Sequence, residues 1–119
     1  MSTRAAHLIR HEGGHIVCGR CVVADSALSR MRGLLGRRRL ERGEGLLLRP
    51  AGSIHTAFMR FSIDALFLDR DGVVVRIVAE LGPWRTAAAR RARAVIELPA
   101  GECALSGVRI GDRLALEEI

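Results

Sequence analysis

The clearest pattern along the chain is a pair of apolar, β-branched runs on either side of a turn signal. In IDALFLDRDGVVVRIVAEL, which spans residues 63–81, the residues D-R-D-G separate the two runs. Gly72 supplies the positive φ that a tight hairpin turn requires. The pattern therefore predicts an antiparallel hairpin with strands at residues 65–68 and 73–81.

Four further runs have the length and composition of short strands. They are HIVCGRCVV near the N-terminus, GLLL just before Pro50, AVIEL at residues 94–98 and RLALE at residues 113–117. Glycine, proline or charged residues bound each run, which is typical of strands joined by turns. Strands recurring about every eight to twelve residues favour a small closed or half-closed barrel, built on an antiparallel or mixed sheet.

One stretch has helical rather than strand periodicity. Asp25 or Ser26 suits an N-cap, and apolar residues follow at helical spacing. These residues are Leu28, Met31, Leu34 and Leu35. They predict one main helix over about residues 26–36, and a short helical turn is expected over about 101–107. The expected fold class is α+β, mostly β.

Length and composition indicate a single globular domain. A chain of 119 residues, with 49% hydrophobic and 27% charged residues, is long enough for one core and too short for two. Residues 1–14 are expected to form a flexible lead-in, and residues 15–119 the β-rich, barrel-like domain. No run reaches signal-peptide or membrane-span length, so we expect a cytoplasmic protein, with a monomer favoured and no membrane partner.

The charge is strongly basic, at +6, and every one of the 19 basic residues is an arginine. A basic excess can attract nucleic acid. Single-strand binders also need stacking aromatic rings, and the chain has only three Phe and one Trp. The arginine clusters at 37–39 and 90–91 are short. Nucleic-acid binding is therefore an unlikely function, kept as a weak alternative.

Cys18 and Cys21 form a C-G-R-C motif that could serve redox chemistry or zinc binding. In a strand, however, residues three apart point to opposite faces, so the thiols would converge only with a bulge at Gly19. A structural zinc site also needs four ligands. We expect the cysteines to be packing residues, with no metal and no cofactor, and redox and metal roles as minor alternatives.

The assembled motifs resemble a known family. They are ADSALSRMRGLLGR, GLLLRP, SIHTAFMRFSIDALFLDRDGVVV, LGPWR, AVIELPAGE and VRIGD. In this order they resemble the bacterial and archaeal family called domain of unknown function 192, over roughly residues 17–116. The resemblance implies a compact β-rich, barrel-like domain with one main helix. It implies no specific activity, because the family has none established.

Several polar or special positions match the family. They are Arg30, Arg32, His55, Thr56, Met59, Asp64, Glu97, Gly111 and Asp112. Asp64 could accept backbone N–H groups and fix a corner of the fold. Glu97 could be solvated or could pair with Arg30 or Arg32. Gly111 and Asp112 are most simply a turn before the last strand.

His55 has three possible roles. It could make hydrogen bonds that stabilise the fold, contact a ligand, or act as a general base beside Asp64. A serine or cysteine nucleophile placed to work with it is not evident from the sequence, so no catalytic residue is assigned.

Two functions from different classes follow. The first is a non-enzymatic binding or accessory module for a small anionic ligand or a peptide, with a protein as the other possible partner. Its expected ligand-binding residues are Arg30, Arg32, His55, Thr56, Met59, Trp84 and Glu97. The second is a small hydrolase or transferase that uses His55 and Asp64 as an acid–base pair.

Overall fold

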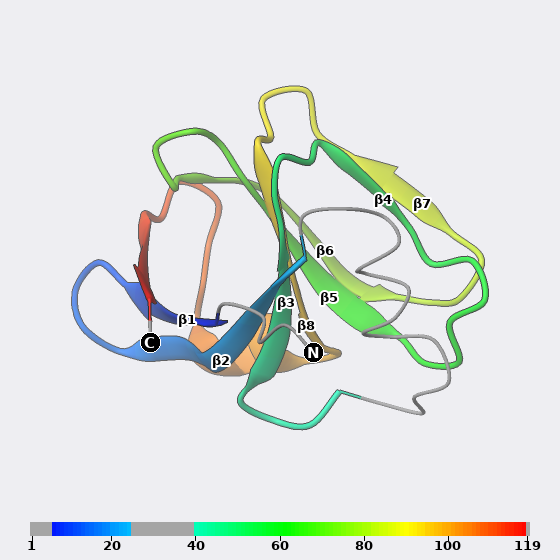
Figure 1. Cartoon of the computed structure of the whole chain (residues 1–119), viewed down its shortest axis with the longest axis horizontal. Coiled ribbons are helices and arrows are strands. Elements are labelled where there is room, and N and C mark those ends of the chain that lie inside the picture. Colours follow the sequence, from blue (N-terminus) through cyan, green and yellow to red (C-terminus); the bar gives the residue numbers. More distant parts are fainter. Residues whose placement is uncertain (1–5, 25–39, 119) are drawn as a thin grey trace, which may run out of the picture.

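The computed structural model describes residues 6–24 and 40–118 (Figure 1). The regular secondary structure of this part of the chain is almost entirely β-strand. In chain order the elements are β1 (Ala6–His11), β2 (Ile16–Ala24), β3 (Glu44–Leu48), β4 (Ser53–His55), β5 (Ile63–Leu68), β6 (Val74–Leu81), β7 (Thr86–Ala88), β8 (Ala94–Pro99), α2 (Glu102–Ser106) and β9 (Leu114–Glu118).

Seven strands form one mixed sheet in the order β6-β5-β8-β3-β2-β1-β9. The β2–β3 pair is parallel, and the other neighbouring pairs are antiparallel. The predicted hairpin is confirmed, since β5 and β6 pair around the D-R-D-G turn. The predicted strands at β2, β3, β8 and β9 are also confirmed. The strands β5 and β8 are covered on both faces, which explains why each is apolar apart from one acidic residue, Asp64 in β5 and Glu97 in β8.

The predicted barrel is not confirmed, because the large sheet stays open. Its outer strands, β6 and β9, approach each other at one end only, through an isolated antiparallel bridge between Val73 and Arg113. Nearby, the Val74 N–H donates to the Asp112 carbonyl at 2.8 Å. Strand spacing and turn signals cannot tell an open sheet from a closed one, because closure depends on how the first and last strands pair.

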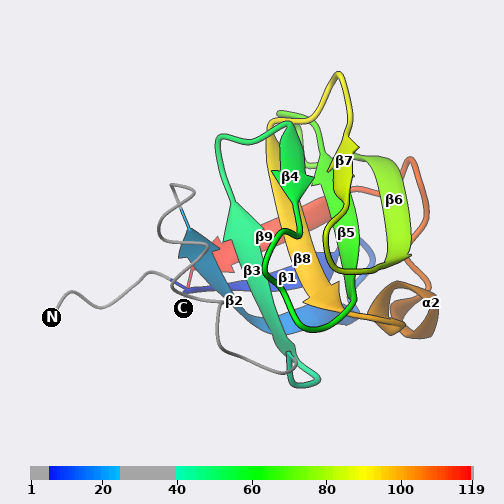
Figure 2. The same ribbon diagram turned by 90° about the vertical axis from the view of Figure 1, so that its right-hand side faces the viewer.

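A second, two-stranded sheet covers one face of the large sheet. It consists of β4 and β7, which pair antiparallel and lie in front of the large sheet in Figure 2. Ile54 and Ala87 from this small sheet join a buried cluster with Phe67 and Val95 of the large one. We call this side of the large sheet the covered face.

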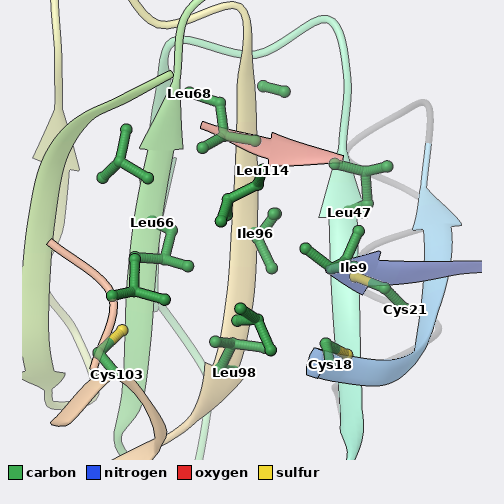
Figure 3. Close-up of a cluster of buried hydrophobic side chains, with 14 residues drawn as sticks. Ile9, Cys18, Cys21, Leu47, Leu66, Leu68, Ile96, Leu98, Cys103 and Leu114 are labelled. Atoms are coloured by element: carbon green, nitrogen blue, oxygen red, sulfur yellow. The ribbon is translucent and has the colours of Figure 1, made fainter. Parts of the chain in front are cut away.

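The opposite face of the large sheet carries a second buried cluster (Figure 3). It includes Ile9, Leu47, Leu66 and Ile96, all fully buried. Because successive residues of a strand alternate sides, neighbours in β5 and β8 belong to different clusters. We call this side the cysteine face, because all three cysteines belong to its cluster: Cys18, Cys21 and Cys103.

Two sequence expectations about the ends and helices need revision. Residues 6–11, expected in a flexible lead-in, form β1 and pair with both β2 and β9. The short helix α2 lies where one helical turn is expected. The main helix expected over about 26–36 falls on residues outside the described part, so the expected pair of helices is not confirmed. Among the described residues, no helix has the length and apolar character to cross a membrane.

Candidate functional site

The side chain and main chain of Thr56 join the loop after β4 to the loop before β7. Thr56 is fully buried, and its hydroxyl donates to the Gly82 carbonyl at 2.6 Å while accepting from the Arg85 N–H at 2.8 Å. Its carbonyl accepts from the Met59 N–H at 3.1 Å and from the Trp84 N–H at 3.0 Å. The Thr56 N–H donates to the Arg85 carbonyl at 2.8 Å. One residue thus fixes both loops, and we call this arrangement the Thr56 clamp.

The clamp holds two large aromatic residues in an unusual backbone conformation. Phe58 has φ 66° and Trp84 has φ 61°. This left-handed region is uncommon for any residue with a side chain and is a clear outlier for a bulky one. Such a conformation costs of order 1–3 kcal/mol and persists only where the surroundings enforce it. Here the surrounding hydrogen bonds of Thr56 supply that enforcement.

Both rings are directed toward solvent. Phe58 is 61% exposed and Trp84 is 65% exposed, although large apolar side chains are normally buried. The two rings contact each other edge to face, with centroids 4.6 Å apart and an interplanar angle of 60°. We call these two residues the aromatic pair. Exposed, mutually packed and held in a costly conformation, they have the properties of a binding surface rather than of core residues.

Basic residues flank the aromatic pair in the sequence. His55 ends β4, Arg60 follows Phe58 by two positions, and Arg85 follows Trp84 directly; all three are exposed. The segments 51–63 and 82–93 contain no Asp or Glu. The two segments that carry the rings therefore bring arginines and no carboxylate side chain of their own.

The structure brings together part of the expected ligand-binding set. Thr56, Met59 and Trp84 are joined by hydrogen bonds, and His55, the last residue of β4, directly precedes Thr56. Met59 is only 4% exposed, so it packs beneath the loop instead of facing a ligand. Arg30 and Arg32 lie outside the described residues. Phe58 was not among the ligand-binding residues expected from the sequence, because the sequence does not indicate that a phenylalanine adopts a positive φ.

Asp64 serves the fold. It is fully buried, and its Oδ1 accepts from the Glu80 N–H at 2.8 Å. Its Oδ2 accepts from the N–H groups of Gly101 and Cys103 at 3.1 and 2.9 Å. The sequence suggests that this carboxylate could accept backbone N–H groups and fix a corner of the fold. The structure confirms that role.

The proposed acid–base pair of His55 and Asp64 does not form. Asp64 alternates with Ala65 in β5, so it points to the cysteine face, where its partner Cys103 belongs. His55 ends β4, in the small sheet on the covered face, and is exposed. The large sheet thus separates the two side chains. The sequence could not show this, because it does not predict that β4 lies on the opposite face.

Glu97 is a buried residue of the covered face. It is fully buried in β8, directly across from Leu46 of β3 and Ala65 of β5, both of which belong to the covered-face cluster. The alternative in which Glu97 is solvated is therefore wrong, and the alternative of pairing with Arg30 or Arg32 involves residues outside the described part. Glu97 and Asp64 lie on opposite faces of the sheet and do not open on a shared cavity.

The Cys18–Cys21 motif differs from expectation in its geometry. The pairing of β1 with β2 shifts register between His7↔Cys21 and Ile9↔Cys18, so β2 has one extra residue there. This bulge places both thiols in one cluster, and Figure 3 shows them beside Ile9. A hydrogen bond between the two thiols lowers the pKa of Cys18 and, together with burial, raises the pKa of Cys21 well above its usual value.

None of the cysteines has the surroundings of a catalytic nucleophile. Cys18 and Cys21 are at most 1% exposed. Burial, and then the neighbouring Asp64 carboxylate, raises the pKa of the Cys103 thiol to about 12. Cys103 therefore stays protonated at neutral pH. Among the described residues, no group of three or more His, Cys, Asp or Glu side chains is placed to hold a metal ion.

The Gly111–Asp112 segment is the turn expected before the last strand. Gly111 has φ 95°, and Asp112 Oδ2 accepts from the Arg109 N–H at 2.8 Å. The same oxygen lies 2.9 Å from Nε2 of His11. The Arg109 hydrogen bond, followed by that of His11, lowers the pKa of Asp112. This carboxylate thus has a structural role in the turn.

Comparison with solved structures supports the fold. A protein from Sinorhizobium meliloti, described as a "putative transcription regulator", aligns with a TM-score of 0.83 and 24% identity over 98% of this chain and 97% of its own. A protein of unknown function from Novosphingobium aromaticivorans aligns with a TM-score of 0.77 and 23% identity over 92% and 83%. At these identities the likeness shows the fold alone.

Sequence comparison identifies the family. A UPF0127 protein of Thermococcus sibiricus is 33% identical over 92% of this chain and 74% of its own length. A UPF0127 protein of Pyrococcus abyssi is 33% identical over 81% and 85%. The family model DUF192, described as an uncharacterized ACR, matches residues 8–116. The chain therefore belongs to the DUF192 family, whose activity is uncharacterised.

Proposed function

We propose that this domain is a non-enzymatic binding module that recognises a peptide segment carrying both apolar and acidic side chains. The observation that carries the proposal is the aromatic pair, Phe58 and Trp84, exposed and held in the left-handed backbone region by the Thr56 clamp. Backbone strain of this kind clusters at sites where a fixed geometry serves function.

The aromatic pair suits a protein ligand. Aromatic side chains can bury about 150–250 Å² each and dominate the energetics of many interfaces. Tryptophan is among the residues most often found at binding hot spots. Because the Thr56 clamp already fixes both loops, little conformational entropy remains to be lost when a partner binds.

The basic residues near the aromatic pair in the sequence favour a peptide with acidic side chains. His55, Arg60 and Arg85 are exposed and lie within three positions of Phe58 or Trp84 in the sequence, and the two segments 51–63 and 82–93 carry no acidic residue. Carboxylates of a bound peptide would meet guanidinium groups, which form strong, often bidentate hydrogen bonds with them. The enzyme alternative lacks this support, because His55 and Asp64 lie on opposite sides of the large sheet.

The test uses Trp84 as a reporter, because it is the only tryptophan of the chain. Short synthetic peptides with alternating Leu and Glu would be titrated while Trp84 emission is recorded, with the same peptides carrying Gln for Glu as the charge control. We expect a saturable change in emission with the acidic peptides and a weaker one with the Gln peptides.

The matched variants are Phe58→Ala and Leu105→Ala. Both residues are exposed apolar residues, at 61% and 69%, but Leu105 belongs to α2. Phe58→Ala should weaken binding about tenfold or more, and Leu105→Ala should leave it unchanged. Equal binding by both variants, no saturable signal, or tighter binding of a single-stranded oligonucleotide would overturn the proposal.

A further inference from the structure

A second surface lies at the other end of the small sheet. Phe58 and Trp84 lie in the loops after β4 and before β7, whereas the loops before β4 and after β7 meet the β5–β6 turn. In Figure 1 these three loops lie together at the upper end of the molecule. Between them is a cleft of about 310 Å³. Its size falls in the range of small-ligand sites, about 300–1,000 Å³.

Arginines from three separate loops line this cleft. Arg49 precedes β4, Arg70 lies in the β5–β6 turn, and Arg93 follows β7. The floor is apolar, with Leu68 and Leu114 among its residues. We call this site the arginine cleft. Guanidinium groups that approach from different segments can surround one ligand instead of pairing along the surface.

A neighbouring cleft extends the same basic surface. It has a volume of about 430 Å³, shares Asp69 with the arginine cleft, and adds Arg90 and Arg91. In the described part of the chain, none of these five arginines is in an ion pair; the pairs found there involve Arg10, His11, Arg42 and Arg113.

The acidic residues of the arginine cleft do not neutralise it. Asp69 and Asp71 line the cleft against Arg49, Arg70 and Arg93. Asp69 Oδ1 is already used in the turn, where it accepts from the N–H groups of Asp71 and Val73 at 2.8 and 3.0 Å. The arginine cleft holds three arginines and two aspartates, a formal charge of +1, and with Arg90 and Arg91 of the neighbouring cleft the formal charge of the two clefts is +3.

The main chain holds the three loops in place. The Arg93 N–H donates to the Leu68 carbonyl at 2.7 Å, and the Arg93 carbonyl accepts from the Ala51 N–H at 3.0 Å. The Gly72 N–H donates to the Asp69 carbonyl at 3.1 Å and closes the turn. The loops that carry the arginines are thus joined to one another before any ligand arrives, which lowers the cost of binding.

We infer that the arginine cleft binds a small polyanion with two or more phosphate or carboxylate groups. Arginine forks match the planar, paired oxygens of both groups, and two or more anionic groups would use arginines from more than one loop. The apolar floor accommodates the non-ionic part of the ligand. This site is separate from the aromatic pair and goes beyond the proposed peptide binding.

Isothermal titration calorimetry with inorganic pyrophosphate and with citrate, at matched ionic strength, tests the inference. We expect one saturable site per chain. The stronger of the two ligands identifies whether the cleft prefers phosphate or carboxylate groups, and saturable binding of either supports the site. Absence of saturable heat with both at millimolar concentration would overturn it.

The variants Arg49→Gln and Arg93→Gln should each weaken binding about tenfold or more. Arg20→Gln is the matched control, because Arg20 is an exposed arginine of β2 outside both clefts. Unchanged melting temperatures would show that each variant is folded. The same loss in Arg20→Gln, or a single-stranded oligonucleotide binding more tightly than pyrophosphate, would contradict a small-ligand site.

Phe58→Ala separates the two proposals. It should leave pyrophosphate and citrate binding unchanged while it weakens peptide binding. Loss of anion binding in Phe58→Ala would show that the arginine cleft is not an independent site.

Discussion

Asp64 and Thr56 are both fully buried polar residues, and each fastens backbone from distant segments. Asp64, on the cysteine face, accepts three N–H groups, two of them from residues with positive φ: Glu80 at 53° and Gly101 at 94°. Thr56, on the covered side, joins the loops that contain Phe58 and Trp84, also with positive φ. In both cases one buried polar residue holds backbone groups from distant segments, through a carboxylate that only accepts in Asp64 and through a hydroxyl and the main chain in Thr56.

The two clamps differ in what their strained residues carry. Around Asp64 the positive-φ positions are a glycine and the bulge residue of β6, so the clamp fixes the strand edge and the start of α2. Around Thr56 they are two exposed aromatic rings in mutual contact. Buried hydrogen bonding alone therefore does not identify a functional site. The side chains that those hydrogen bonds position at the surface identify it.

Removing the Asp64 carboxylate should have the largest effect on stability. Asp64→Ala leaves three backbone N–H groups without their buried acceptor, which should cost about 3–5 kcal/mol in the free energy of unfolding. Denaturant unfolding followed by circular dichroism measures this loss. Asp64→Asn retains one acceptor oxygen and should lose less. A loss under about 1 kcal/mol in Asp64→Ala would mean that the clamp is not needed for the fold.

The hydroxyl of Thr56 should have a smaller effect on stability and a larger one on the site. Thr56→Val keeps the shape but removes the partner of the Gly82 carbonyl and the Arg85 N–H, at a cost of about 1–3 kcal/mol. Because the Trp84 loop then loses part of its support, the emission of Trp84 should also shift. Thr56→Ser retains the hydroxyl and should preserve both properties. An unchanged emission spectrum in Thr56→Val would mean that the Thr56 hydroxyl does not determine the position of Trp84.

The smallest effects on stability should come from replacing a residue with positive φ by glycine. Glycine adopts this region without strain but loses more conformational entropy on folding, so Glu80→Gly and Trp84→Gly should each change stability by no more than about 1 kcal/mol. Trp84→Gly should abolish peptide binding measured by calorimetry, and Glu80→Gly should not. Equal peptide binding in both variants would remove the distinction between the two clamps.

Much of the large sheet could be predicted from the sequence, because its central strands are apolar and bounded by turn residues. The β5–β6 hairpin, β3 and β8 all have this pattern. The β4 and β7 strands have only three residues each, and β1, AHLIRH, is partly polar, so no periodicity indicates them. The arrangement of the large sheet could not be predicted without β1, which pairs with the outer strand β9.

The same missing strands explain the errors at the candidate site. Because β4 and its position on the covered face are not evident from the sequence, the sequence does not show that the large sheet lies between His55 and Asp64. Without β1, the bulge that brings Cys18 and Cys21 together cannot be placed, although Gly19 marks where it could occur. Thr56 and Trp84 could be selected as site residues. Phe58 could not, because its exposure and positive φ depend on the clamp.

Among the described residues, no strand pairs with the outer edges of β6 and β9 beyond the Val73–Arg113 bridge and its neighbouring hydrogen bonds. Natural sheets prevent aggregation at such edges with charged side chains and with bulges that interrupt regular pairing. Both devices are present here. The β9 strand ends in exposed Glu117 and Glu118, and β6 is bulged where Glu80 adopts its positive φ. The hydrogen bond that Asp64 accepts from the Glu80 N–H therefore also helps to keep the edge strand β6 irregular, which disfavours pairing with a further strand.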